Sequence, residues 1–86
     1  MAPDDRISQL RNLGPRSESW LNAVGINTRA DLEKVGSVVA YRWVVEHGFA
    51  PSLNLLYAME GALRDVHWTN LDPDLRDRLR REAQAS

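Results

Sequence analysis

Two segments of this chain are apolar on nearly every face, and they constrain the fold more than any other feature. Among residues 38–45 only Arg42 is charged, and among residues 53–63 the polar side chains are Asn54 and Glu60. A helix that is apolar all round is normally central and buried. The sequence therefore predicts a central hairpin of two helices, with a few apolar side chains left exposed because the chain is small.

The rest of the chain is also expected to be helical. No window alternates apolar and polar residues over the length of a strand, so we predict an all-α fold. Start and stop signals divide the chain into a compact bundle of five to six short helices, followed by frayed residues at 83–86. The predicted helices cover about residues 5–12, 15–24, 28–35, 37–48, 51–66 and 72 onward.

Single residues mark the ends of these helices. Asp4 or Asp5 is expected to cap the first, Thr28 the third and Ser37 the fourth, because short polar side chains accept hydrogen bonds from the first backbone N–H groups. Gly25 is expected to end the second helix in a left-handed conformation.

Two residues inside 53–63 require a structural explanation. Glu60 needs a partner for its charge, and Arg42 or Arg64 can supply one; Arg64 stands at the i+4 spacing of helical ion pairs. Gly61 costs a helix about 1 kcal/mol relative to alanine. A close helix crossing at Gly61 would explain why it is tolerated.

The run Asn-Leu-Gly-Pro-Arg-Ser at residues 12–17 joins the first two predicted helices by a tight turn. Proline suits the first position of a helix, so the next backbone N–H groups point out of the helix start and can bind an anion such as a nucleic-acid phosphate. The turn can equally serve only to reverse the chain. The candidate nucleic-acid residues are Arg11, Asn12, Gly14, Arg16, Ser17 and Arg29.

Charge and composition limit the possible functions. The 86 residues are expected to form a single domain, and the net charge of −1 argues against strong non-specific binding of nucleic acid. The chain has no cysteine, no apolar run long enough to cross a membrane and no signal peptide, which fits a cytoplasmic protein.

Catalytic motifs are missing from the sequence. His47 and His67 are the two histidines, and neither has a partner at metal-ligand spacing. No nucleophile motif or nucleotide-binding glycine loop is present. We therefore predict a protein that is not an enzyme and that needs no metal or cofactor.

The apolar excess of residues 38–45 and 53–63 supports an alternative function, that of a protein-interaction or dimerisation module. Its candidate interface residues are Trp43, Leu55 and Met59. A near-neutral chain suits contact with a protein better than contact with phosphate.

The motifs taken together resemble the C-terminal domain of the TfoX/Sxy family over about residues 7–80. The matching residues are Leu10 to Ser17, Trp20-Leu21, Val24-Gly25-Ile26, Thr28-Arg29, Asp31-Leu32, Ala40-Tyr41-Arg42, Pro51 to Ala58, Glu60 to Leu63, His67-Trp68 and Leu71. The resemblance implies a small helical domain with a helix-hairpin-helix element. In better-known members this domain follows an N-terminal α/β domain and belongs to regulators of competence genes.

This resemblance implies a regulatory role through weak DNA contact or protein contact. Residues 1–86 are expected to be the C-terminal-like domain alone, so the partners would be DNA, a separate N-terminal TfoX-type domain or a second copy. The usual DNA-binding hairpin begins with glycine where this chain has Asn12. Asparagine tolerates a left-handed conformation, so we expect the turn to be kept, with the Asn12 side chain crowding a bound phosphate.

Overall fold

The computed structural model describes residues 4–85 and shows an all-α chain, which confirms the predicted fold class. Five α-helices and two short 3-10 turns follow one another, and the one β-type pairing within residues 4–85 is an isolated bridge. The helical elements are η1 (Ile7–Gln9), α1 (Pro15–Ala23), α2 (Arg29–Val35), α3 (Ser37–Glu46), α4 (Leu53–Arg64), η2 (Trp68–Asn70) and α5 (Pro73–Gln84).

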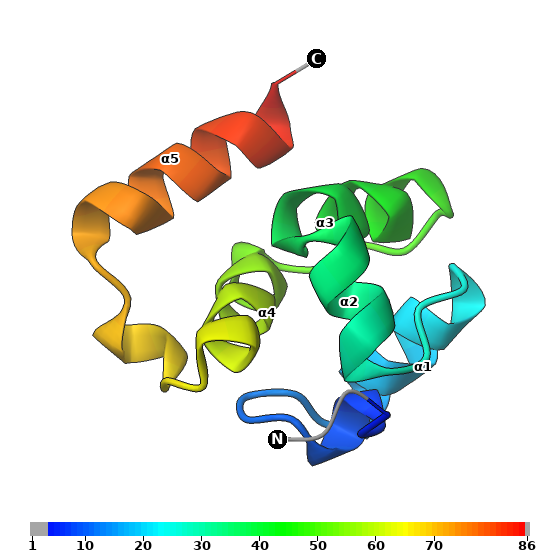
Figure 1. Ribbon diagram of the computed structural model, residues 1–86. Helices are drawn as coiled ribbons and strands as arrows, with labels where there is room; N and C mark the ends of the chain where they lie inside the picture. Colours follow the sequence, from blue (N-terminus) through cyan, green and yellow to red (C-terminus); the bar gives the residue numbers. More distant parts are fainter. Residues whose placement is uncertain (1–3, 86) are drawn as a thin grey trace.

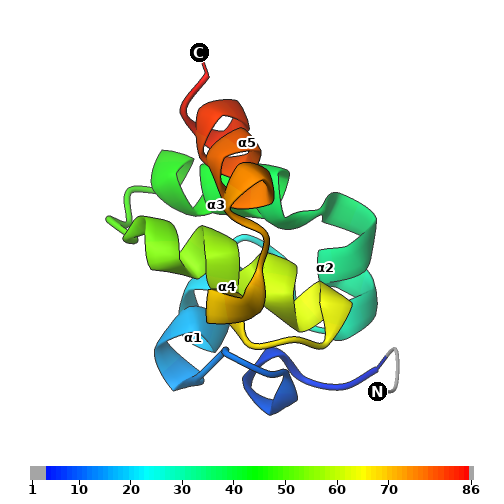
Figure 2. The same ribbon diagram turned by 90° about the vertical axis from the view of Figure 1, so that its left-hand side faces the viewer.

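Helix α4 runs through the middle of the molecule, and the other elements surround it (Figure 1, Figure 2). It contacts α2, α3, α5 and η2, whereas α1 packs against η1 and α3. In both views η1 lies near one end of the molecule and the end of α5 lies at the other. The central position of α4 follows from its sequence, because it has an apolar side chain on almost every face.

The core draws on every part of the chain. Its largest fully buried side chains are those of Ile7, Leu21, Ile26, Leu32, Val44, Leu56 and Met59. The large apolar side chains that stay exposed within residues 4–85 are Val39, Trp43 and Val45, and all of them belong to α3. The predicted central pair of helices is present, but its exposed apolar surface lies on α3 alone.

Glu60 joins the two central helices through a hydroxyl group. Its Oε2 accepts from Arg64 Nε at 2.6 Å within α4, as the i+4 spacing predicts. Its Oε1 accepts from the hydroxyl of Ser37 at 2.6 Å, at the start of α3. The cross-link to α3 therefore comes from Ser37 and not from Arg42.

The capping predictions are correct for α2 and wrong for α3. Thr28 Oγ1 accepts from the backbone N–H of Asp31 at 3.2 Å, and the Asp31 carboxylate accepts in return from the Thr28 N–H at 3.3 Å. The N-cap of α3 is Gly36, at a φ of 88°, and Ser37 is the first helical residue. Ser37 does not cap because its hydroxyl is used by Glu60, a tertiary contact that the local sequence does not reveal.

The first predicted helix, residues 5–12, is wrong in its extent. Only η1 forms, its N-cap is Arg6 rather than either preceding aspartate, and Leu10 returns to an extended conformation. Asn12 then adopts a φ of 72°. The apolar side chains of this segment still reach the core, because a 3-10 turn followed by extended chain presents them on the same side. The hairpin thus joins a 3-10 turn to α1 instead of joining two α-helices.

Helix α4 ends earlier than predicted, at Arg64. Asp65 adopts the left-handed conformation with a φ of 57° and a ψ of 43°, and the N–H of Val66 reaches the carbonyl of Gly61 at 2.9 Å. This is the helix-ending pattern in which a left-handed residue is followed by a hydrogen bond back over the last turn. Gly25 ends α1 in the same manner at a φ of 86°, as predicted.

The close approach at Gly61 is made by a loop and not by a crossing helix. A Cβ atom at this position would lie 2.6 Å from Asn12 Nδ2, 2.8 Å from the carbonyl oxygen of Val66 and 3.3 Å from the Cα of Trp68. Glycine therefore lets the chain between α4 and η2, together with Asn12, lie directly against α4.

Helix α5 covers the far side of α3 and α4. It turns Leu79 and Ala83 into the core, with Leu75 half-buried beside them. The predicted fraying at residues 83–86 is wrong for Ala83 and Gln84, which are helical. Ala83 is buried in the core, which holds the last turn in place; Ser86 lies outside the described residues.

Candidate nucleic-acid interface

The start of α1 presents unused backbone N–H groups. Gly14 is the N-cap, with no side-chain cap, and Pro15 is the first helical residue. The first intrahelical hydrogen bond runs from Glu18 N to Gly14 O at 3.0 Å. The N–H groups of Arg16 and Ser17 precede this bond, so they point out of a helix end that carries a partial positive charge.

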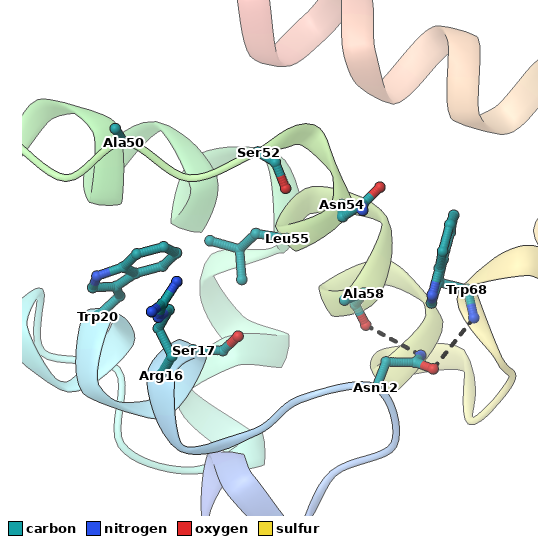
Figure 3. A pocket seen from close by; sticks show the side chains of 10 residues that line it. All are labelled: Asn12, Arg16, Ser17, Trp20, Ala50, Ser52, Asn54, Leu55, Ala58 and Trp68. Atoms are coloured by element: carbon teal, nitrogen blue, oxygen red, sulfur yellow. Dashed lines mark hydrogen bonds between the residues drawn. The ribbon is translucent and has the colours of Figure 1, made fainter.

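These two residues lie at a groove between α1, the start of α4 and η2, with a volume of about 400 Å³ (Figure 3). The groove brings together segments that are far apart in the sequence. Its lining residues are Asn12, Arg16, Ser17, Trp20, Ala50, Ser52, Asn54, Leu55, Ala58 and Trp68. The structure therefore places three of the predicted nucleic-acid residues, Asn12, Arg16 and Ser17, on one surface.

Asn12 is occupied by contacts within the protein. Its Nδ2 donates to the carbonyls of Val66 at 2.9 Å and Ala58 at 3.4 Å, and its Oδ1 accepts from the N–H of Trp68 at 3.3 Å. Figure 3 shows the side chain turned toward α4 and η2 rather than toward Arg16. The expectation that this side chain contacts or crowds a phosphate is therefore corrected: its polar atoms tie the hairpin to α4 and η2.

Arg29 is also engaged inside the fold. It pairs with Glu33 and donates from Nη2 to the carbonyl of Leu63 at 3.2 Å, near the end of α4. Its side chain is only 20% exposed. Its guanidinium holds α2 against α4, and the phosphate contact of Arg29 stays a prediction.

Arg11 lies outside the groove. Its Nε is 3.4 Å from Asp65 Oδ1, and both side chains are more than half exposed. Such an exposed pair contributes little to stability, so the Arg11 charge remains accessible to an anion, although it is partly neutralised.

Arg16 is exposed and forms no ion pair with a carboxylate of residues 4–85. Its guanidinium carbon lies 6.0 Å from the ring centroid of Trp20, at the reach of a cation–π contact. Ser17, beside it, is half-buried and turns its hydroxyl toward the groove (Figure 3). A guanidinium, a hydroxyl and two outward N–H groups form a donor set suited to phosphate.

Glu18 does not face this donor set. Its carboxylate accepts from the N–H of Ser8 at 3.0 Å and lies 3.8 Å from Arg6 Nε. The hydrogen bond from Ser8, followed by the charge of Arg6, lowers the pKa of Glu18. The negative charge that the sequence places beside Arg16 is therefore directed to η1.

Sequence reasoning missed the other side of the groove. Ser52 and Asn54 start α4, and neither side chain is hydrogen-bonded within residues 4–85. Trp20 is stacked on Phe49 with ring centroids 5.8 Å apart, and Trp68 stands at η2. No local signal marks these residues, because the contacts of Asn12 bring η2 to the hairpin.

The predicted protein interface is reduced to one residue. Trp43 is 40% exposed on α3. Met59 is fully buried and Leu55 is 5% exposed at the base of the groove, so neither can form an interface on the outer surface. The prediction that Leu55 and Met59 form an interface is therefore wrong, because the apolar side chains of α4 pack into the core.

The two histidines lie at the ends of helical elements. His47 caps the end of α3 and its ring lies 5.2 Å from that of Phe49, while His67 Nδ1 accepts from the N–H of Thr69 at 3.3 Å at the start of η2. Across residues 4–85 no three side chains of metal-binding type gather at one place. Among the same residues no helix has the length and apolar character needed to cross a membrane.

The solved structures that resemble this chain include two from Listeria monocytogenes. An uncharacterized protein in a triclinic crystal form has a TM-score of 0.86 and 32% identity, over 93% of this chain and 91% of its own. A protein of unknown function in a tetragonal form has a TM-score of 0.84 and 33% identity, over 91% of this chain and 96% of its own. Among curated proteins, none matches.

The sequence also matches the family model of the TfoX C-terminal domain over residues 3–83. This match spans nearly the whole chain, and it confirms the resemblance carried by the hairpin, the two apolar helices and the closing His-Trp pair. The chain belongs to the TfoX C-terminal domain family.

Proposed function

We propose that this domain is a non-enzymatic regulatory module that binds the phosphate backbone of DNA weakly at the start of α1. Membership of the TfoX C-terminal domain family supports a regulatory role. The observation that carries the DNA contact is Arg16: it is exposed, it has no acidic partner within residues 4–85, and it stands beside the outward N–H groups of α1.

The electrostatics favour weak binding. The net charge is −1, so the molecule as a whole does not attract DNA. Arg11 and Arg29, which were expected to assist Arg16, are paired with acidic side chains. Binding at this site therefore relies on few phosphate contacts, and its dependence on salt should be shallow in comparison with that of strongly basic proteins.

Replacing Arg16 by alanine tests this proposal. We expect the variant to bind duplex DNA roughly fivefold more weakly, about 1 kcal/mol, because one charged donor is lost. The loss should be equal for unrelated sequences, and the salt dependence should fall by about one phosphate contact. Fluorescence anisotropy of labelled duplexes, measured between about 50 mM and 200 mM salt, gives both quantities.

Arg78→Ala is the matched control. Arg78 is exposed on α5, also forms no ion pair with a carboxylate of residues 4–85, and lies outside the groove. Both variants remove one positive charge, so only a local contact distinguishes them. Equal affinities for the two variants, or no duplex binding by the parent protein at low salt, would contradict the proposal.

A second candidate function is contact with a protein through α3. It is favoured by one observation: Val39, Trp43 and Val45, the exposed large apolar side chains of residues 4–85, all belong to this helix. A second copy of the domain or an N-terminal TfoX-type domain would be the partner.

Replacing Trp43 by serine tests this second candidate. We expect the parent protein to show a rising mass in light scattering as its concentration increases, or on addition of a separately expressed N-terminal domain. The serine variant should show a smaller rise, because it removes a large apolar contact. A parent protein that stays monomeric and ignores the N-terminal domain rules this candidate out.

A further inference from the structure

We infer that the groove between α1, the start of α4 and η2 accepts an unpaired nucleobase next to its phosphate, so that the preferred ligand is single-stranded nucleic acid. This inference rests on the proposed phosphate contact at Arg16 and adds the class of nucleic acid. It is carried by the walls of the groove, which contain two of the three tryptophans of the chain.

The two tryptophans stand on opposite sides of the groove, with Leu55 and Ala58 between them (Figure 3). Trp20 comes from α1 and Trp68 from η2, so the site is built from both ends of the sequence. An apolar floor between aromatic walls suits the flat, weakly polar face of a base. Base–aromatic stacking is the usual means by which single strands are held without regard to sequence.

The aromatic walls differ in how they are supported. Trp20 is stacked on Phe49 and packs against the core, which fixes its position, and the Arg16 guanidinium lies 6.0 Å from its ring centroid. Trp68 is half-buried but does not pack against the core cluster, and its ring is stacked on that of His67 at 6.1 Å. Trp68 therefore keeps apolar surface available to a ligand.

Polar side chains with unused hydrogen-bonding groups line the same groove. Ser52 and Asn54 make no side-chain hydrogen bonds within residues 4–85. The Asn54 amide offers both donors and an acceptor, which match the mixed donors and acceptors on the edge of a base. Arg16 and Ser17 lie across the groove from them, at the phosphate side (Figure 3).

The groove has room for a base, and its tryptophans favour an unpaired base over a duplex. A volume of about 400 Å³ lies within the usual range of small-molecule sites, roughly 300–1,000 Å³. In a duplex the faces of the bases are hidden by stacking, so a duplex can offer only its phosphates to Arg16. A single strand can use both the phosphate donors and the tryptophans.

Replacing Trp68 by alanine distinguishes the two modes of binding. The probes are a labelled single-stranded oligothymidylate and a labelled duplex of equal length, titrated by anisotropy at low salt. The parent protein should bind the single strand more tightly. Trp68→Ala should weaken single-strand binding by about fivefold or more, as expected for one lost stack, and should leave duplex binding unchanged.

Two further variants control this experiment. Trp68→Phe keeps an aromatic face and should restore most of the single-strand affinity, whereas Asn70→Ala changes an exposed side chain of η2 outside the groove and should change neither affinity. Arg16→Ala should weaken both ligands. In a Trp43→Phe background, fluorescence comes from Trp20 and Trp68, and the single strand should quench it more than the duplex does.

The outcomes separate this inference from the proposed function. If the duplex binds in a manner that depends on Arg16, while the single strand binds no more tightly and Trp68→Ala has no effect, the groove does not take a base and the phosphate contact stands. If neither probe binds, both are wrong. Circular dichroism of each variant establishes that a loss of binding is not a loss of fold.

Discussion

Replacing Asn12 by alanine is expected to lower the free energy of unfolding by about 3 kcal/mol. The change removes the partners of three backbone groups, the carbonyls of Ala58 and Val66 and the N–H of Trp68. It also forces an alanine to adopt a φ of 72°, which asparagine tolerates better. In a domain of this size, the expected fall in Tm is roughly 12–24 °C.

Asn12→Gly is the matched variant for this prediction. Glycine loses the same hydrogen bonds but accepts a positive φ without strain, so it should be about 1 kcal/mol less damaging than alanine. Urea denaturation, monitored by circular dichroism, measures the free energy of unfolding of both variants. If the alanine variant is as stable as the parent protein, the contacts of Asn12 do not hold the hairpin.

Replacing Gly61 by alanine should destabilise the domain by about 2 kcal/mol, although the same change stabilises most helices by about 1 kcal/mol. The added Cβ would lie 2.8 Å from the carbonyl oxygen of Val66, which is backbone and cannot simply rotate away. It would also lie 2.6 Å from Asn12 Nδ2. Thermal unfolding of the variant shows directly whether its stability falls or rises.

The combination of Asn12→Gly with Gly61→Ala tests whether the two positions act together. The glycine at position 12 removes one of the two closest contacts of the new Cβ, so the alanine should cost less in that background than in the parent. A double-mutant cycle reports this difference as a coupling energy. Strictly additive effects, or a stabilising Gly61→Ala, would show that the loop after α4 moves aside at little cost.

Local chemistry accounts for the parts of the fold that the sequence predicts correctly. The start of α1 at Pro15, the cap of α2 at Thr28 and the end of α1 at Gly25 each depend on one residue and its near neighbours. Residues 5–12 fail because the spacing of their apolar residues is also satisfied by a 3-10 turn. Asn12 instead holds this segment in place through tertiary contacts. Its partners lie more than 40 residues away in the sequence.

Only the part of the candidate site that depends on local sequence could be predicted. Arg16 and Ser17 follow from a Gly-Pro helix start, a local pattern. Arg29 looked available in the sequence, but its partner Leu63 lies 34 residues further on. Trp68 belongs to the groove only because Asn12 holds η2 against the hairpin, and no periodicity or motif encodes that contact.

The contacts of Asn12 also couple ligand binding to folding. The walls of the groove belong to α1 and η2, and Asn12 joins the chain before α1 to the first residue of η2. A peptide containing only the hairpin would lack one wall, so the groove exists only when the domain is folded. A ligand of the groove therefore binds the native state alone and stabilises the domain by an amount that grows with the ratio of ligand concentration to Kd.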